Sequence, residues 1–237
     1  MGQSYFIWKN KDCRSMGVKL GGPVAIVRPE ERVRHVEIPG RSGDLTETEG
    51  EDIYNSYIQT ATILVHGGYR AGKVFDWLRG SGYVTFSGEP DRKQAARIIG
   101  AVTLNKHSYN LDWWAGEVQF YCQPFKELLN EAKVTITSSG ATVRNSGDVS
   151  CRPMWKVTPS ATSASITVGG KTFTVTGLTS GTVIWIDSDS MEVWNADKTA
   201  LLTVNSTGEF PVLAAGNNTV TGSGWSSIEI EKRERYL

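Results

Sequence analysis

The fold class follows from the stretch Gly116-Glu117-Val118-Gln119-Phe120-Tyr121-Cys122, in which apolar and polar side chains alternate. In an extended strand successive side chains point to opposite faces, so Val118, Phe120 and Cys122 share one face. The polar residues between them share the other. This period of two predicts a β-strand with one buried face, and residues 57–66 repeat it.

Between residues 66 and 83 the period changes. Val74, Trp77 and Leu78 are spaced i, i+3 and i+4, which predicts a short one-sided helix that ends at Gly80-Ser81-Gly82. One helix among many strands predicts an N-terminal β-sandwich over residues 1–130, with the helix covering an edge or an end. The other strands expected here are 4–8, 33–38, 83–87 and 97–105.

Residues 131–237 are rich in Ser and Thr and show short alternating runs separated by glycine turns. This pattern of short strands and turns is typical of a β-sandwich or jelly roll. The chain is therefore expected to be mainly β, with a boundary at Asn130-Glu131 and a C-terminal galectin-like or jelly-roll β-sandwich. The strands expected here are 133–137, 154–158, 165–168, 171–175, 182–186, 191–194, 218–221 and 228–231.

The charge balance excludes several classes of function. The 237 residues carry 25 Lys plus Arg and 25 Asp plus Glu, so the net charge is zero. A dedicated nucleic-acid binder needs an excess of cations, and so does polybasic membrane attachment. No run approaches the ~20 apolar residues of a membrane span, so no membrane insertion is expected. Three scattered histidines and three cysteines without C-x-x-C argue against a metal site, and we expect no cofactor.

One motif has the form of a phosphate-binding loop. Residues Gly67–Lys73 match G-x-x-x-x-G-K, follow a strand and open a helix. Val74, however, stands where Ser or Thr must bind magnesium, and the helix is too short for a doubly wound core. We interpret the segment as a glycine-rich turn with a solvated lysine. An ATP-binding enzyme remains the third hypothesis for the whole chain.

Two other patterns could indicate catalysis or a metal. Gly40-Arg41-Ser42-Gly43 resembles half of a nucleophile elbow, but Ser42 has no local base, and the segment is expected to be a turn. Asp187 and Asp189 could indicate calcium or glycoside hydrolysis. Asp187-Ser188-Asp189-Ser190 more simply predicts a tight hairpin, because Asp and Ser bond their own backbone. The expectation is that the protein is not an enzyme.

Four tryptophans of the C-terminal half suggest a second class of function. Trp155 and Trp185 lie within alternating runs and are expected in the core. Trp194 and Trp225 lie at strand ends or loops, where an indole face can stack on a sugar ring. The alternative function is therefore a carbohydrate-binding module that recognises a host cell-surface saccharide through Trp194 and Trp225.

Several segments follow one another in a specific order. They are Glu37–Leu45 with P-G-R-x-G, the Trp77 helix leading into Gly82–Phe86, Val118–Phe125 with F-x-C-x-P, Gly208–Leu213 with G-E-F-P-x-L, and the charged tail Glu231–Arg235. Their order and spacing together resemble the distal tail proteins (Dit) of long, non-contractile-tailed bacteriophages. The likeness covers nearly the whole chain, although Glu209 and Ser146 stand where Asp and Pro are expected.

The resemblance implies a structural hub in the virion, at the phage tail tip, assembled in the host cytoplasm. It implies a homo-oligomer, a hexameric ring built by the N-terminal domain, with the C-terminal sandwich pointing outward. The implied partners are the tail tube protein above and tail-tip or receptor-binding proteins below, and DNA passes through the centre. A lumen for DNA should not attract phosphates.

The acidic segment 44–52 is expected to be a solvated loop. Because it holds five acids and no base, we hypothesise that it lies near the lumen or the ring face. These five residues are Asp44, Glu47, Glu49, Glu51 and Asp52.

Overall fold

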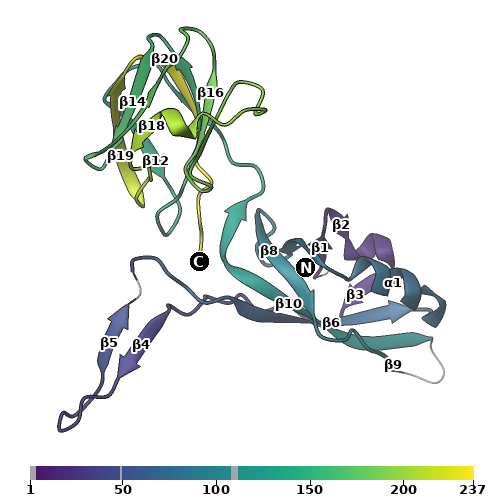
Figure 1. The fold of residues 1–237 in the computed structure, drawn as a ribbon. Helices are drawn as coiled ribbons and strands as arrows, with labels where there is room; N and C mark the ends of the chain where they lie inside the picture. Colours follow the sequence, from purple (N-terminus) through teal and green to yellow (C-terminus); the bar gives the residue numbers. More distant parts are fainter. Residues whose placement is uncertain (1–3, 49, 108–111) are drawn as a thin grey trace. The chain divides into compact units, whose positions relative to one another are not determined.

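The computed structural model describes residues 4–48, 50–107 and 112–237. The chain is mainly β and divides into two compact units, Met1–Leu129 with Leu237, and Asn130–Tyr236 (Figure 1). No helix in the described residues combines the length and apolar character that a membrane crossing needs.

The N-terminal unit is built on one eight-stranded antiparallel sheet. Strands β2 and β3 are the first and last strands of this sheet, and the short 3₁₀ helix η1 (Cys13–Met16) connects them. The sheet is therefore curled, with its two edge strands close to η1. The layers of the expected sandwich thus belong to one continuous sheet. Its order is β2 (Lys11–Asp12), β1 (Phe6–Trp8), β7 (Ser81–Phe86), β8 (Arg92–Ile99), β10 (Trp113–Leu128), β6 (Tyr57–His66) and β3 (Val18–Leu20), while β9 (Leu104–Lys106) pairs with β10.

Aromatic side chains fill the interior of this curled sheet. The ring of Phe120 lies 5.6 Å from the rings of Phe6, Trp8 and Phe86. The seven-residue helix α1 (Ala71–Trp77) buries Val74 and Trp77 against them, as the i, i+3, i+4 spacing predicts. These rings form the N-terminal core.

Helix α1 is also tied to the sheet by polar contacts. The Trp8 indole donates to the Trp77 carbonyl over 3.1 Å, and the Trp77 indole donates to the Trp8 carbonyl over 3.2 Å. Each indole thus satisfies its buried N–H on the other residue's backbone.

The expected alternation in β6 and β10 is confirmed. In β10, Val118, Phe120 and Cys122 are buried, while Gln119 and Tyr121 are exposed. Pairing runs without a break from Trp113↔His66 to Cys122↔Tyr57.

The expected strand 97–105 is wrong in its middle. Strand β8 ends at Ile99, Gly100 takes a left-handed φ of 70°, and β9 begins only at Leu104. The chain then turns back so closely that a Cβ on Gly116 would lie 2.0 Å from the Thr103 carbonyl oxygen. β10 is longer than expected because a register shift between Cys122 and Lys126 absorbs Pro124 and lets pairing with β8 continue.

The C-terminal unit contains two five-stranded antiparallel sheets. Trp155, Phe173 and Ile166 are among the residues buried in their common core. Strands β12 and β18 were not expected from the sequence. One sheet is β11 (Val134–Ile136), β20 (Trp225–Glu231), β13 (Met154–Pro159), β16 (Ile184–Asp187) and β17 (Glu192–Trp194); the other is β12 (Ala141–Asn145), β19 (Gly216–Ser223), β14 (Ser163–Val168), β15 (Lys171–Thr176) and β18 (Ser206–Gly208).

We predict that Phe120→Ala lowers the free energy of unfolding of the N-terminal unit by about 3–5 kcal/mol, because it removes a ring packed against three others and leaves a cavity. Tyr121→Ala is the matched control, since this neighbouring ring is 41% exposed on the other face. It should cost less than about 1 kcal/mol. Urea denaturation followed by fluorescence measures both, and equal losses would contradict the assigned faces.

Candidate functional sites

A separate two-stranded hairpin projects from the N-terminal unit. Among the described residues, strands β4 (Val33–Val36) and β5 (Leu45–Thr48) pair only with each other, from Val33↔Thr48 to Val36↔Leu45 (Figure 1). All four residues of β5 are exposed. An isolated two-stranded hairpin is only marginally stable in water.

The acidic segment lies on this hairpin, and its expected loop conformation is wrong for residues 45–48, which form β5. Asp44, Glu47 and Glu51 are exposed and Asp52 is half-buried; Glu49 lies outside the described residues.

The charge of the acidic segment is partly compensated across the hairpin. Arg34 of β4 lies directly opposite Glu47 of β5. A sequence window cannot show this pairing, because the two residues are far apart along the chain. Residues 33–48 carry Glu37, Asp44 and Glu47 against Arg34 and Arg41, so the hairpin has a net charge of −1.

The two tryptophans that were expected to bind sugar, Trp194 and Trp225, lie in different environments. Trp225 is only 9% exposed, belongs to the core, and donates its indole N–H to the Ser165 carbonyl over 3.0 Å. It therefore offers no ring face to a ligand. Its position at the start of β20, after a glycine turn, suggested a free loop, but the pairing of β13 with β20 draws it inward.

The other tryptophans also differ from expectation. Trp155 is buried as expected, with its indole N–H bonded to Ser188 over 3.0 Å. Trp185, expected in the core, is half-buried on the outer face of its sheet. It lies directly opposite Trp194 in the β16–β17 ladder, so Trp185 rather than Trp225 accompanies Trp194.

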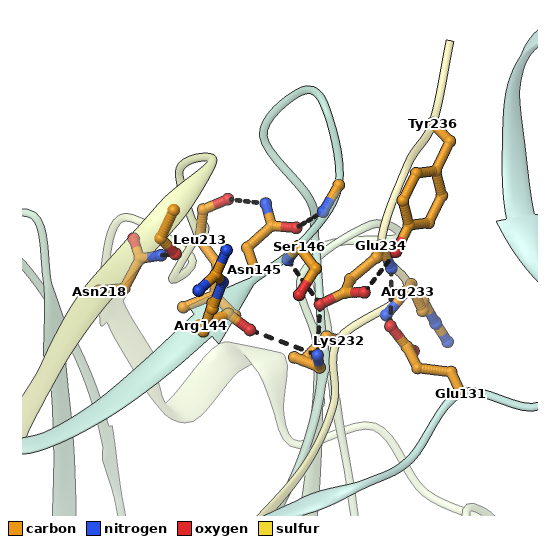
Figure 2. A network of polar contacts seen from close by, with 12 residues as sticks. Glu131, Arg144, Asn145, Ser146, Leu213, Asn218, Lys232, Arg233, Glu234 and Tyr236 are labelled. Carbon is orange, nitrogen blue, oxygen red and sulfur yellow. Dashed lines mark hydrogen bonds and ion pairs between the residues drawn. The ribbon is translucent and has the colours of Figure 1, made fainter.

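A polar network holds the C-terminal tail in the C-terminal unit (Figure 2). The Glu131 carboxylate accepts the backbone N–H groups of Arg233 and Glu234 at 2.7 and 3.0 Å. The Glu234 side chain, itself almost fully buried, accepts from the Ser146 backbone and the Tyr236 hydroxyl, both at 2.8 Å, and from Lys232. Sequence reasoning missed this network because its members are far apart along the chain.

Asn145 extends the network to the neighbouring loops. It is 1% exposed, and its amide nitrogen donates to the carbonyls of Val149, Leu213 and Ala214. Its side-chain oxygen accepts from the Gly147 backbone over 2.9 Å. One buried amide thus satisfies several backbone groups and fixes the loop after β12. Its role is structural.

The two aspartates that could have indicated a calcium site form ion pairs with arginines. Arg233 makes a two-pronged contact with Asp187 at 2.8 and 3.1 Å, and Arg235 bonds Asp189 at 2.8 Å. Asp187 also accepts the Asp189 backbone N–H, which makes the tight turn expected from the sequence. Among the described residues, no group of three or more His, Cys, Asp or Glu side chains could hold a metal ion.

The G-x-x-x-x-G-K segment does not form a nucleotide site. Its strand β6 is antiparallel to both neighbours, and the chain passes through η2 (Gly68–Arg70) into the short helix α1. The Tyr69 ring lies against Gly67, where a Cβ would be 2.4 Å from a ring carbon. Lys73 is exposed on α1. Ser42 lies in the exposed turn between β4 and β5.

Two of the cysteines are poor nucleophiles. All three are free and buried, and burial raises the pKa of Cys122 and of Cys151 to about 12. A thiol with such a pKa stays protonated at neutral pH.

The comparisons with known proteins bear on the whole chain. No family model matches the sequence, and no curated protein matches it. Among solved structures, the chain is similar to the Dit protein (gp 19.1) of phage SPP1, described as a paradigm of the hub adsorption apparatus in phages that infect Gram-positive hosts. The match covers 100% of both chains with a TM-score of 0.79 at 18% sequence identity. The chain therefore has the Dit fold, in both units.

We predict that the C-terminal unit loses stability in acid through Glu234 and Asp187. Burial alone would raise the pKa of each carboxyl. Hydrogen bonds and the charge of Lys232 nevertheless hold the pKa of Glu234 below its ordinary 4.5, and hydrogen bonds and the charge of Arg233 hold that of Asp187 below 3.8. A lowered folded pKa contributes stability above the unfolded value, and that stability is lost as the pH falls through the folded value. Glu234→Gln should cost about 1–3 kcal/mol at pH 7.

Unfolding free energies of both proteins between pH 7 and pH 3 provide the measurement. The variant should depend less steeply on pH below about pH 5. Glu209→Gln is the matched control, because that glutamate is exposed and pairs only with an exposed lysine. Parallel pH curves for the wild type and Glu234→Gln would refute the assignment.

Proposed function

We propose that this protein is a distal tail hub protein of a siphophage. It forms a hexameric ring in the virion that joins the tail tube to the tail tip and host-adsorption apparatus, and DNA passes through the ring. Its role is structural and not catalytic. The observation that carries the proposal is the full-length match to the SPP1 Dit fold, which includes both units and leaves no part of either chain unmatched.

The hairpin supports the assembly part of this proposal. A closed ring needs head-to-tail interfaces, in which one surface of each copy meets a different surface of the next. A hairpin that pairs only with itself and exposes every residue of β5 is suited to be one of these surfaces. Its exposed backbone edges can add hydrogen bonds to a neighbouring sheet.

The acids of the hairpin suit a position at the lumen or at a ring face. Asp44, Glu47 and Glu51 are exposed, and Arg34 offsets only part of their charge. A surface with net negative charge repels DNA phosphates and avoids the counterion release that a basic lining would favour. A ring reconstruction with these acids on the outer circumference would exclude this placement.

We predict that the purified protein forms particles of six times the monomer mass, with a central hole. Light scattering gives the mass and electron micrographs give the symmetry. Replacing residues 33–48 by a short Gly-Ser linker should abolish the ring, while both units keep their unfolding transitions, because the hairpin shares no strand pairing with the larger sheets.

A protein that stays monomeric at every concentration and in the presence of its tail tube protein would contradict the hub proposal. A ring that survives the linker replacement would leave the hub in place and exclude the hairpin as its contact.

A further inference from the structure

Two tryptophans occupy neighbouring positions on the outer face of the sheet that contains β16 and β17. Trp185 and Trp194 are directly opposite each other in the ladder, and both are half-buried. Ile186 and Val193 next to them are buried in the core. Because side chains alternate along a strand, both indoles belong to the outer face.

The turn that follows β17 holds a lysine over one of these rings. Asn195 fixes the turn, since its side-chain oxygen accepts the backbone N–H groups of Thr199 and Ala200 at 2.8 and 3.1 Å. The Trp185 indole N–H donates to the Ala196 carbonyl over 3.1 Å. Lys198 takes a left-handed φ of 55°, and its Nζ lies 4.1 Å from the centre of the Trp185 ring.

The left-handed φ of Lys198 belongs to the turn, because the Lys198 backbone N–H donates to the Asn195 carbonyl over 3.1 Å. Lys198 is exposed, and the turn places its cation on an indole at the surface.

Charged groups without ion-pair partners surround the two rings. Lys156 places its Nζ 5.4 Å from the Trp185 ring centre, and Glu192 lies on the same face as Trp194, two residues away. In the described part of the chain, neither these two side chains nor Lys198 forms an ion pair, whereas Asp187 and Asp189 nearby are paired with arginines. The face thus combines apolar rings with a free hydrogen-bond acceptor and free donors.

We propose that this face binds a hexose-containing saccharide, with Trp194 as the stacking ring. The C–H face of a pyranose is apolar and suits an indole, and its hydroxyl groups both donate and accept hydrogen bonds. Glu192 accepts from hydroxyls beside Trp194, and Lys198 donates to oxygens on the side of Trp185. Because Lys198 covers Trp185, that ring positions the lysine and does not itself stack on the sugar.

A saccharide fits this face better than an acidic peptide does. A peptide chosen for negative charge would meet Glu192 beside the half-buried ring of Trp194, whereas hydroxyl groups complement the carboxylate and the ammonium groups together. The proposal adds ligand recognition to the hub and does not depend on ring formation.

Isothermal titration of the full chain tests the proposal with a panel of soluble ligands. The panel holds neutral hexose and N-acetylhexosamine oligomers, glycerol-phosphate-linked and uronic-acid oligomers, and a glutamate-rich peptide. We expect saturable binding of at least one hexose-containing member. Trp194→Ala should weaken this binding at least about tenfold, and Lys198→Ala by a smaller factor of about threefold.

Two controls separate specific loss from general effects. Lys171→Ala removes an exposed lysine from the other sheet of the same unit, and Tyr69→Ala removes an 80% exposed ring from the N-terminal unit. Both should bind as the wild type does. Circular dichroism and electron micrographs show whether the Trp194→Ala protein keeps its fold and its assembly state.

Several results would overturn the saccharide site. No binding of any saccharide at millimolar concentration would do so, and so would unchanged binding by a folded Trp194→Ala protein. Equal losses in Lys198→Ala and Lys171→Ala would mean unspecific attraction to charge. Preference for the glutamate-rich peptide would assign the face to a protein partner. None of these outcomes alters the ring, so the hub proposal is judged separately.

Discussion

The N-terminal unit depends on the register between β6 and β10. A slip of one residue would turn every side chain of β10 to the opposite face, which would expose Phe120 and bury Tyr121. The register is secured on both sides, because β8 pairs with the other edge of β10 and β3 with the other edge of β6. The aromatic core and the packing of helix α1 against it follow from this single alignment.

In the C-terminal unit, the residues that follow the last strand, β20, are held in place by polar contacts. The carboxylates of half-buried Glu131 and buried Glu234 do this by accepting backbone N–H groups of residues that have left the sheet. A charged acceptor makes a stronger hydrogen bond than a neutral one, and Lys232 offsets the cost of burying Glu234. The C-terminal sandwich is thereby held closed by polar groups as well as by its apolar core.

Local sequence patterns predicted the strands and the helix whose type depends only on neighbouring residues. The alternation in β10 and the spacing of Val74 and Trp77 are examples, and both were confirmed. Patterns failed where the outcome depends on a distant partner. Strand β12 contains Arg144 and Asn145, and nothing nearby in the sequence shows that Asn145 will be buried under the loop carbonyls of Leu213 and Ala214.

The tryptophans show the same limit for a candidate site. Trp185 was expected in the core but lies on the outer face, and Trp225 was expected at a strand end or loop but is buried. A short run does not reveal which face a neighbouring strand will cover. Pairing of β16 with both β13 and β17 places Trp185 outward beside Lys156 and Trp194. The sequence shows which residues are present, but only the ladder shows which of them meet.

The hairpin of β4 and β5 has a consequence for the handling of the free protein. Backbone that lacks tertiary packing opens at little cost, and proteases cut where the chain opens. Exposed Arg34 and Arg41 offer trypsin two cleavage positions within this projection. A preparation cut there would retain the strand pairing of the larger sheets and look sound by most spectroscopic criteria, while its β4–β5 hairpin would be broken.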